Sequence, residues 1–189
     1  MPNYSNRPPA DPRGPSLPLL RTPTRGGITA IVTSDDLVGT PTHFYKGRTT
    51  PCDSPDCEAC GKGYPWRWHG YVAAYLQKRR MHFLFEFTAR IAEHFVAYRD
   101  THGSTRGCLF KAHRVNSQPN ARVILETQRA DLTEIYIPKP PDVIQCLSVL
   151  WNLAAPDIDV DTLMKQIPRL HVNQNGEGQL LEPETPNPV

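Results

Sequence analysis

Three cysteines lie within nine residues of one another, and their spacing is the strongest chemical signal in the chain. Cys52, Cys57 and Cys60 form the pattern Cys-x4-Cys-x2-Cys. A Cys-x2-Cys step lets two thiolates reach one ion from a tight turn, and Gly61 and Gly63 relax the backbone nearby. A structural zinc ion takes four ligands in a closed tetrahedron. The spacing therefore predicts a structural Zn²⁺ site that needs one further ligand.

The fourth ligand is open to choice from the sequence alone. We expect His43, just upstream of Cys52, and His69, beyond the cysteines, is the competitor. Asp53 and Asp56 are weaker candidates beside three thiolates. The alternative to a metal site is three free thiols in a loop, which the clustering disfavours. A catalytic zinc is also disfavoured, because the His-x-Glu motif of zinc deaminases is absent.

The net charge of +2 conceals an asymmetry between the two parts of the chain. Residues 1–125 contain 17 Lys/Arg and 9 Asp/Glu and sum to +8, whereas residues 126–189 contain 4 and 10 and sum to −6. Two windows, 59–85 and 101–125, contain no acidic residue at all. A charge run is usually only a solvated face, but two acid-free windows on predicted strands favour contact with a polyanion.

Hydrophobic periodicity predicts three strands, one helix and two further strands. We place the strands at about 28–38, 67–76, 81–88, 107–115 and 121–127, and the helix at 89–102. This is the element order of the OB-fold, a five-stranded Greek-key barrel in which a helix joins strands three and four. We therefore expect a mainly β protein, with a five-stranded OB-fold barrel over residues 26–136. The predicted zinc loop, 43–63, lies between strands 1 and 2.

The residues that could contact nucleic acid are aromatic rings and cations in and around the cysteine segment and the predicted strands. On the second strand, Trp68, Val72, Ala74 and Leu76 look like core, and the stripe Met81, Phe83, Phe85 and Phe87 on the third strand is also read as core. Rings stack on bases while Lys and Arg neutralise phosphates. The candidates for stacking are Phe44, Tyr45, Trp66, Tyr71 and Tyr75. The candidates for phosphate contacts are Arg48, Arg67, Lys78, Arg79, Arg80, Lys111, Arg114 and Arg122. For each residue alone, a core ring or a solvated cation is an equally good interpretation.

The two ends of the chain differ from its centre in composition. Residues 1–25 are rich in proline and predict a disordered arm. Residues 137–170 predict a C-terminal helical extension, with apolar helices at 142–153 and 159–167 that dock on the barrel or bind a partner protein. Residues 171–189 predict a disordered tail, which could also recruit a partner. Cys108 and Cys146 are read as small buried residues.

Several classes of function are disfavoured by absent signals. No apolar run reaches the roughly 18 residues that span a bilayer, and the N-terminal residues contain no apolar signal core. We expect a cytoplasmic protein, of a bacterial or phage-infected cell, with no membrane partner. A phosphate-binding glycine loop, a nucleophile elbow and a convincing pair of carboxylates are all lacking, so we do not expect an enzyme.

An OB-fold with one histidine followed by three cysteines resembles the single-stranded DNA-binding proteins of T-even bacteriophages. The zinc subdomain of that family uses one His and three Cys in this order, which His43, Cys52, Cys57 and Cys60 match at shorter spacings. The resemblance covers roughly residues 26–130. It implies sequence-non-specific binding of single-stranded DNA in replication, recombination or repair. Tails of such proteins recruit partners, although here the C-terminal tail is only weakly acidic.

The leading expectation is thus a binder of single-stranded nucleic acid, with DNA preferred and with a structural zinc. An alternative is a zinc-stabilised protein-interaction adaptor of a nucleic-acid machine, whose C-terminal helices dock on a larger assembly. A second alternative is an RNA-binding protein, which the same barrel and charges would serve.

Overall fold

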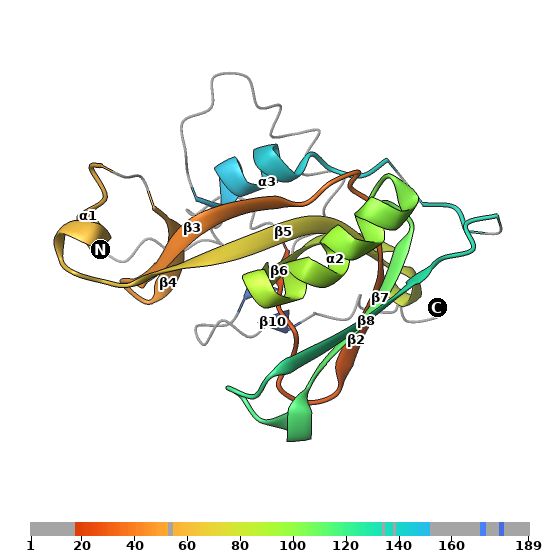
Figure 1. The fold of residues 1–189 in the computed structure, drawn as a ribbon, viewed down its shortest axis with the longest axis horizontal. Coiled ribbons are helices and arrows are strands. Elements are labelled where there is room, and N and C mark those ends of the chain that lie inside the picture. Colours follow the sequence, from red (N-terminus) through yellow and green to blue (C-terminus); the bar gives the residue numbers. More distant parts are fainter. Residues whose placement is uncertain are drawn as a thin grey trace, which may run out of the picture.

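The computed structural model describes residues 18–52, 55–133, 135–137, 139–151, 171–172 and 178–179. These residues form a mainly β protein in which one large mixed sheet is flanked by short and medium helices (Figure 1). The strands of the large sheet are β1 (Leu19–Leu20), β2 (Gly27–Val32), β3 (Val38–Tyr45), β4 (Arg48–Pro51), β5 (Trp66–Leu76), β6 (Met81–Thr88), β7 (Cys108–Arg114) and β8 (Val123–Arg129). Strands β9 (His171–Val172) and β10 (Gly178–Gln179) form a second, two-stranded antiparallel sheet. The α-helices are α1 (Glu58–Gly61), α2 (Ala89–His102) and α3 (Val143–Leu150).

The order of strands in the sheet is β1-β6-β5-β2-β7-β8, and β3 pairs with both β4 and β5. All of these pairs are antiparallel except β1 with β6, which makes the sheet mixed. Within the described residues the path runs from β1 to β8 without returning to its start. The large β-sheet is thus as expected, whereas the closed barrel is not confirmed.

The first predicted strand, 28–38, is in fact two strands. β2 ends at Val32, and a turn follows in which the Asp36 carboxylate accepts a hydrogen bond of 2.7 Å from the Leu37 amide. β3 then begins at Val38. Both strands pair with β5, which is 11 residues long and so has room for two partners along one edge. A local Asp-rich turn therefore overrides the β-branched pattern that suggested one continuous strand.

The predicted zinc loop, 43–63, is also more ordered than expected. Its first part is a β-hairpin, in which β3 and β4 are joined by Lys46 and Gly47, both at positive φ (52° and 78°). Two central residues with positive φ suit the right-handed twist of a hairpin. Its second part contains the single-turn helix α1. The segment is therefore a β-hairpin followed by a short helical turn. We call β3, β4 and the part of β5 that pairs with β3 (Trp66–Tyr71) the ribbon, and the turn at α1 the knuckle.

The main core lies between one face of the sheet and α2. Phe85 is packed against Phe95 of α2 and Phe110 of β7, with ring centroids 6.5 and 4.7 Å away. The predicted helix 89–102 and the core assignment of the Phe83–Phe87 stripe are confirmed. The helix ends at Gly103, whose φ of 80° is the left-handed cap that glycine adopts without strain.

Helix α3 packs against part of the opposite face of β5 and β6. Val143, Cys146 and Leu147 of α3 pack against the buried ring of Tyr71, which also meets Trp151 edge-on at 5.6 Å. The predicted helix 142–153 is thus present as α3, docked on the same chain. The predicted helix at 159–167 lies outside the described residues, and so do residues 1–17 of the predicted arm.

The last part of the predicted disordered arm is ordered. Leu19 and Leu20 form β1, which runs parallel to β6 opposite Leu84 and Phe85. Leu19 and Leu20 pack into clusters on the two faces of the sheet. This burial of apolar surface explains why the stretch is ordered although the proline-rich arm was expected to be disordered. Among the described helices, none is both long and apolar enough to cross a membrane.

Candidate metal centre

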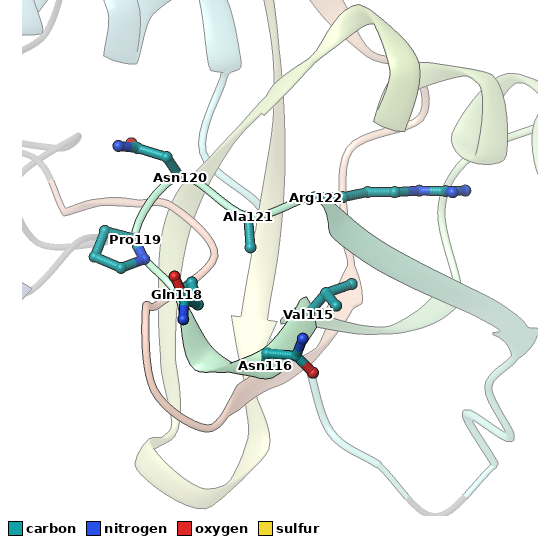
Figure 2. A pocket seen from close by; sticks show the side chains of 7 residues that line it. All are labelled: Val115, Asn116, Gln118, Pro119, Asn120, Ala121 and Arg122. Carbon is teal, nitrogen blue, oxygen red and sulfur yellow. The ribbon is translucent and has the colours of Figure 1, made fainter.

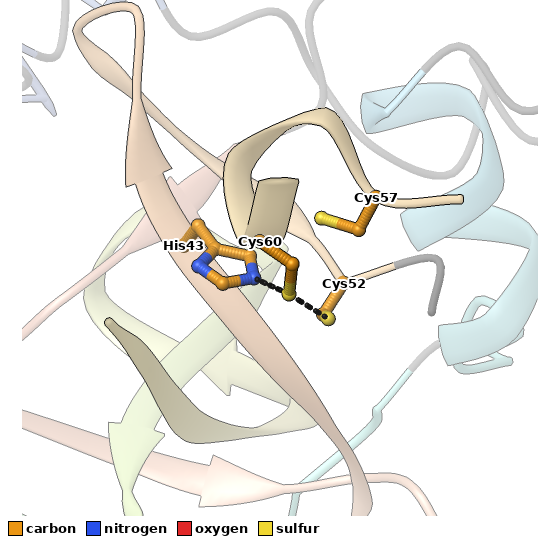
Figure 3. A group of neighbouring side chains, drawn as sticks. All are labelled: His43, Cys52, Cys57 and Cys60. Atoms are coloured by element: carbon orange, nitrogen blue, oxygen red, sulfur yellow. Dashed lines mark hydrogen bonds between the residues drawn. The ribbon is translucent and has the colours of Figure 1, made fainter. Parts of the chain in front are cut away.

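His43 is the buried member of the candidate centre and comes from β3, where it lies opposite Thr50 of β4 and Trp66 of β5. It lies on β3 between Thr42 and Phe44, with only 1% of its surface exposed. Its Nδ1 lies 3.2 Å from the carbonyl oxygen of Pro65, a geometry in which Nδ1–H donates to that oxygen. The hydrogen bond selects the tautomer that leaves Nε2 as a lone-pair donor for a metal ion. Nε2 in turn lies 3.3 Å from Cys60 Sγ (Figure 3).

The three cysteines reach the same point from three pieces of backbone. Cys52 follows β4, and its amide donates to the Pro41 carbonyl at 2.9 Å. Cys57 precedes α1, and Cys60 lies within it. The turn is closed by hydrogen bonds from the Gly61 amide to the Cys57 carbonyl and from the Gly63 amide to the Cys60 carbonyl, at 3.0 and 2.9 Å.

The four side chains point toward one another, and their ligand atoms all lie within 4.8 Å of each other (Figure 3). The Cys52 and Cys60 sulfurs are 3.5 Å apart. Ligands about 2.0–2.3 Å from a zinc ion in a tetrahedron lie roughly 3.3–3.8 Å from one another. The four donor atoms are therefore compatible with a tetrahedral zinc site that has protein ligands only.

The thiols need a cation before they can all ionise. A hydrogen bond in which the Cys60 thiol donates to Cys52, followed by desolvation, raises the pKa of Cys60 to about 11. Three thiolates this close repel one another, and a divalent ion removes that repulsion when it binds. Metal binding at this cluster would therefore release protons.

The other candidate ligands do not join the cluster. His69 uses Nδ1 in a 2.6 Å contact with Thr42 Oγ1, and its Nε2 lies 3.9 Å from a Glu86 oxygen. Along β3 and β5 these groups alternate with His43, so His69 lies on the other face of the ribbon. Asp56 is outside the cluster, and Asp53 is not among the described residues. The structure thus favours His43 among the alternatives.

A second set of contacts holds α1 against the ribbon without using the metal. The Glu58 carboxylate accepts hydrogen bonds from Lys62, Tyr45 and Lys46 at 2.7, 2.7 and 3.0 Å. Lys62, then Tyr45 and Lys46, lower the pKa of Glu58 to about 2. This clamp fixes the knuckle that carries Cys57 and Cys60. It also engages the Tyr45 ring, so Tyr45 is not available for stacking on a base.

Two further predicted stacking residues are not accessible. Tyr71 is fully buried under α3, and Tyr75 is buried against His82, with ring centroids 5.0 Å apart. Both lie on the face of β5 that sequence reasoning assigned to nucleic acid. For these two rings the assignment is wrong, because α3 covers Tyr71 and Tyr75 packs against His82, whereas Arg67 near the start of β5 remains exposed.

The remaining rings and most of the cations are exposed. Phe44 and Trp66 expose 69% and 59% of their surfaces. The exposed cations of the predicted set are Arg48, Arg67, Lys78, Arg79, Arg80, Lys111 and Arg122. Lys111 lies opposite Glu126 in the β7–β8 register, which weakens its case as a phosphate contact. Arg114 is half-buried and donates to the carbonyls of Thr22 and Ala121, so its role is structural.

Arg122, one of these cations, is among the residues that line a hollow at the connection between β7 and β8. The hollow has a volume of about 660 Å³ and is lined by Val115, Asn116, Gln118, Pro119, Asn120, Ala121 and Arg122. Figure 2 shows the Arg122 side chain extending away from the loop that forms the hollow. The connection joins the antiparallel strands β7 and β8, and it lies far along the sheet path from the metal centre.

Sequence reasoning missed two structural features on or near the ribbon. Tyr64 is exposed beside the knuckle and meets Tyr45 edge-on at 5.1 Å; its place in the glycine-flanked segment after Cys60 was a usable signal. The ion pair between Arg21 and the buried Glu86 was also missed. No local pattern connects residues that far apart.

Comparisons of the chain with protein-family models, with curated proteins and with solved structures find no significant match in any of the three.

Proposed function

We propose that the chain is a zinc-stabilised binding protein for single-stranded nucleic acid, with DNA preferred, and that it acts in replication, recombination or repair. The observation that carries the proposal is the end of the ribbon, where Phe44, Arg48, Trp66 and Arg67 are exposed around the candidate metal centre. We call these four residues the ribbon tip. The metal ion has a structural role in the proposal, and the protein is not an enzyme.

The pairing of rings with cations supports this function. Residues opposite one another in an antiparallel pair share a face, and the side chains alternate along each strand. The β3–β4 and β3–β5 registers therefore place Phe44 on one face with Arg67, and Trp66 on the other face with Arg48. Each stacked base contributes about 1–3 kcal/mol, and an adjacent cation neutralises its phosphate.

The charge around the ribbon tip is also suitable. Neither Arg48 nor Arg67 forms an ion pair within the described part of the chain. The nearby lysines behave differently, because Lys46 and Lys62 are both engaged by Glu58. The two arginines are thus the free cations beside the exposed rings, and we assign the phosphate contacts to them first.

The strand order supports an OB-fold as the framework. The path β6-β5-β2-β7-β8, with α2 between β6 and β7, matches an OB-fold order up to the pairing that would close the barrel. In the described residues, β6 pairs on that side with β1. Two features support a resemblance to the single-stranded DNA-binding proteins of T-even phages. They are this strand order and the order of the candidate ligands His43, Cys52, Cys57 and Cys60 along the chain.

A second candidate function is that of a protein-interaction adaptor. The observation in its favour is a pair of exposed apolar side chains in the C-terminal part, Tyr136 and Ile144. Large apolar side chains of this kind occur at protein interfaces as well as singly on ordinary surfaces. The adaptor predicts tight binding to a protein and none to an oligonucleotide.

Fluorescence anisotropy with labelled oligo-dT, a matching duplex and oligo-U, across a salt series, tests the proposal. We expect binding to oligo-dT that weakens steeply with salt, weaker binding to oligo-U and least to the duplex. The double variant Phe44→Ala/Trp66→Ala should lower the affinity for oligo-dT by at least tenfold, because each stack removed takes away about 1–3 kcal/mol. Removing Arg48 or Arg67 should reduce the salt slope by about 0.7 for each phosphate that is no longer neutralised.

Tyr136→Ala is the matched control, since it removes an even more exposed ring that is not part of the ribbon tip. It should leave oligo-dT binding unchanged. Equal binding to single strand and duplex, or an undiminished affinity in the double variant, contradicts the proposal. Tighter binding to oligo-U than to oligo-dT would assign the site to RNA.

A further inference from the structure

The outer edge of β6 carries a short segment of the chain that is docked like a bound peptide. The Leu84 amide donates to the Pro18 carbonyl at 2.8 Å, and Leu19 and Leu20 pair in parallel with Leu84 and Phe85. Leu19 packs with the cluster under α3, whereas Leu20 packs with the main core. Main-chain hydrogen bonds combined with alternating side-chain contacts are how an extended peptide adds to the edge of a sheet.

The next residue of the segment forms an ion pair with a buried acid. Arg21 Nε lies 2.7 Å from one oxygen of Glu86, and its Nη2 lies 3.0 Å from the other. The same Nη2 donates to Thr49 Oγ1 of β4 at 2.7 Å. The Glu86 side chain is 3% exposed, whereas that of Arg21 is 47% exposed. A two-point contact of this kind suits a guanidinium and is matched poorly by an ammonium.

The buried carboxylate of Glu86 needs a positively charged partner at the outer edge of β6. The nearest alternative partner is His69, whose Nε2 is 3.9 Å from the carboxylate. Burial lowers the pKa of His69, so the imidazole is mostly neutral at pH 7 and cannot replace Arg21. A buried carboxylate without a partner is strongly destabilising. The edge therefore selects for an occupant that carries arginine directly after two apolar residues.

We propose that the β6 edge, with the Leu84–Glu86 backbone, the Glu86 carboxylate and Thr49, is a peptide-binding site for a partner protein. The partner supplies an extended segment of the pattern apolar-apolar-Arg, and Glu86 determines the specificity. Residues 18–22 of the chain itself occupy the site in the absence of that partner. This site is separate from the ribbon tip, and the proposal does not depend on nucleic-acid binding.

Several features make the resident segment exchangeable. Its strand is only two residues long, and residues 21–26, which link it to β2, form neither strand nor helix. Arg21 is half exposed, so a competing guanidinium can approach while the resident one leaves. A tethered segment has an effective concentration on the order of millimolar, so a partner segment must bind more tightly than the isolated resident sequence to displace it.

The test uses a fluorescein-labelled peptide of residues 18–24 and the full-length chain. In the Arg21→Ala variant the resident segment no longer has its ion pair, and we expect the labelled peptide to bind at least tenfold more tightly than it binds the wild type. A control peptide with citrulline at the arginine position keeps the shape of the side chain and removes its charge. It should bind the variant at least tenfold more weakly than the arginine peptide.

Equal affinity for the arginine and citrulline peptides overturns the proposal. If Arg21→Ala does not fold, ¹⁵N NMR of the wild type with excess unlabelled peptide decides: exchange at the Leu84 amide is expected, and unperturbed Leu84 and Glu86 signals overturn the proposal. Concentration-dependent dimers of the wild type that exchange this segment would make a second copy the occupant, and the proposed partner protein would then be wrong.

Discussion

At the residue scale, the five cysteines divide into two groups by their surroundings. Cys52, Cys57 and Cys60 converge on His43, whereas Cys108 and Cys146 are buried among apolar side chains that raise the pKa of each thiol to about 12. We predict that serine at any of the first three positions lowers the zinc content after dialysis well below one ion per chain. Cys108→Ala and Cys146→Ala are the matched controls and should retain the ion. Retention by Cys57→Ser, measured by atomic emission, would contradict the assigned ligand set.

His82 is a buried residue whose titration affects stability. Its Nε2 has no hydrogen-bond partner in the described structure, and burial lowers its pKa from 6.5 to about 4. His82 therefore becomes protonated near pH 6.5 in the unfolded chain but only near pH 4 in the folded chain. The free energy of unfolding should fall as the pH is lowered across this range.

His82→Phe removes that titration while it keeps a ring against Tyr75. The difference between the two proteins, measured by urea unfolding at pH 7, 6 and 5, isolates the histidine, because protonation of the metal ligands is common to both. The wild type should lose more stability than the variant as the pH falls. Parallel pH profiles would show that His82 is not held neutral by the fold.

Tyr71 has a similar unpaired group beneath α3. Its ring is fully buried, and its hydroxyl finds no hydrogen-bond partner among the described residues. Burying a hydroxyl without a partner costs about 1–3 kcal/mol. Tyr71→Phe should therefore be neutral or should raise the free energy of unfolding by about 1 kcal/mol. A clear loss of stability in thermal or urea unfolding would mean that the hydroxyl is paired in solution.

At the element scale, the packing of aromatic rings against β5 depends on glycine. A Cβ added to Gly70 would lie 2.4 Å from the Phe87 ring and 2.7 Å from the Trp68 ring. The main core closes around these rings, so Gly70→Ala should cost about 1–3 kcal/mol through overpacking. Gly61→Ala is the control, because a Cβ there meets nothing within 4 Å. The midpoint of urea unfolding, compared between the two variants at equal m-values, measures the effect.

The elements also show where sequence reasoning succeeds. The helix over 89–102 and the strands near 67–76, 81–88 and 107–115 follow from clear apolar periodicity and are confirmed. The β3–β4 hairpin was not expected, because its sequence of threonine, histidine and proline lacks the alternation that signals a half-buried strand. The Lys46-Gly47 turn was a weaker signal than an Asn-Gly turn would have been.

At the scale of the whole molecule, local pattern is insufficient to identify exposed residues. The clustering of the three cysteines was predictable because Cys-x2-Cys spacing is itself a local geometry. The burial of Tyr71 on β5 was not predictable from local sequence. It depends on α3 and β1, which come from distant parts of the chain. Alternation along a strand separates two faces, and only tertiary packing decides which face remains in water.

The central claim is that a metal ion holds the ribbon tip in the shape that binds a single strand. The most direct measurement is oligo-dT anisotropy on the full chain before chelation, after chelation, and during stepwise return of zinc. The account predicts that affinity disappears on chelation and recovers in proportion to zinc, to completion at one ion per chain. Undiminished oligo-dT binding by the metal-free chain would contradict it.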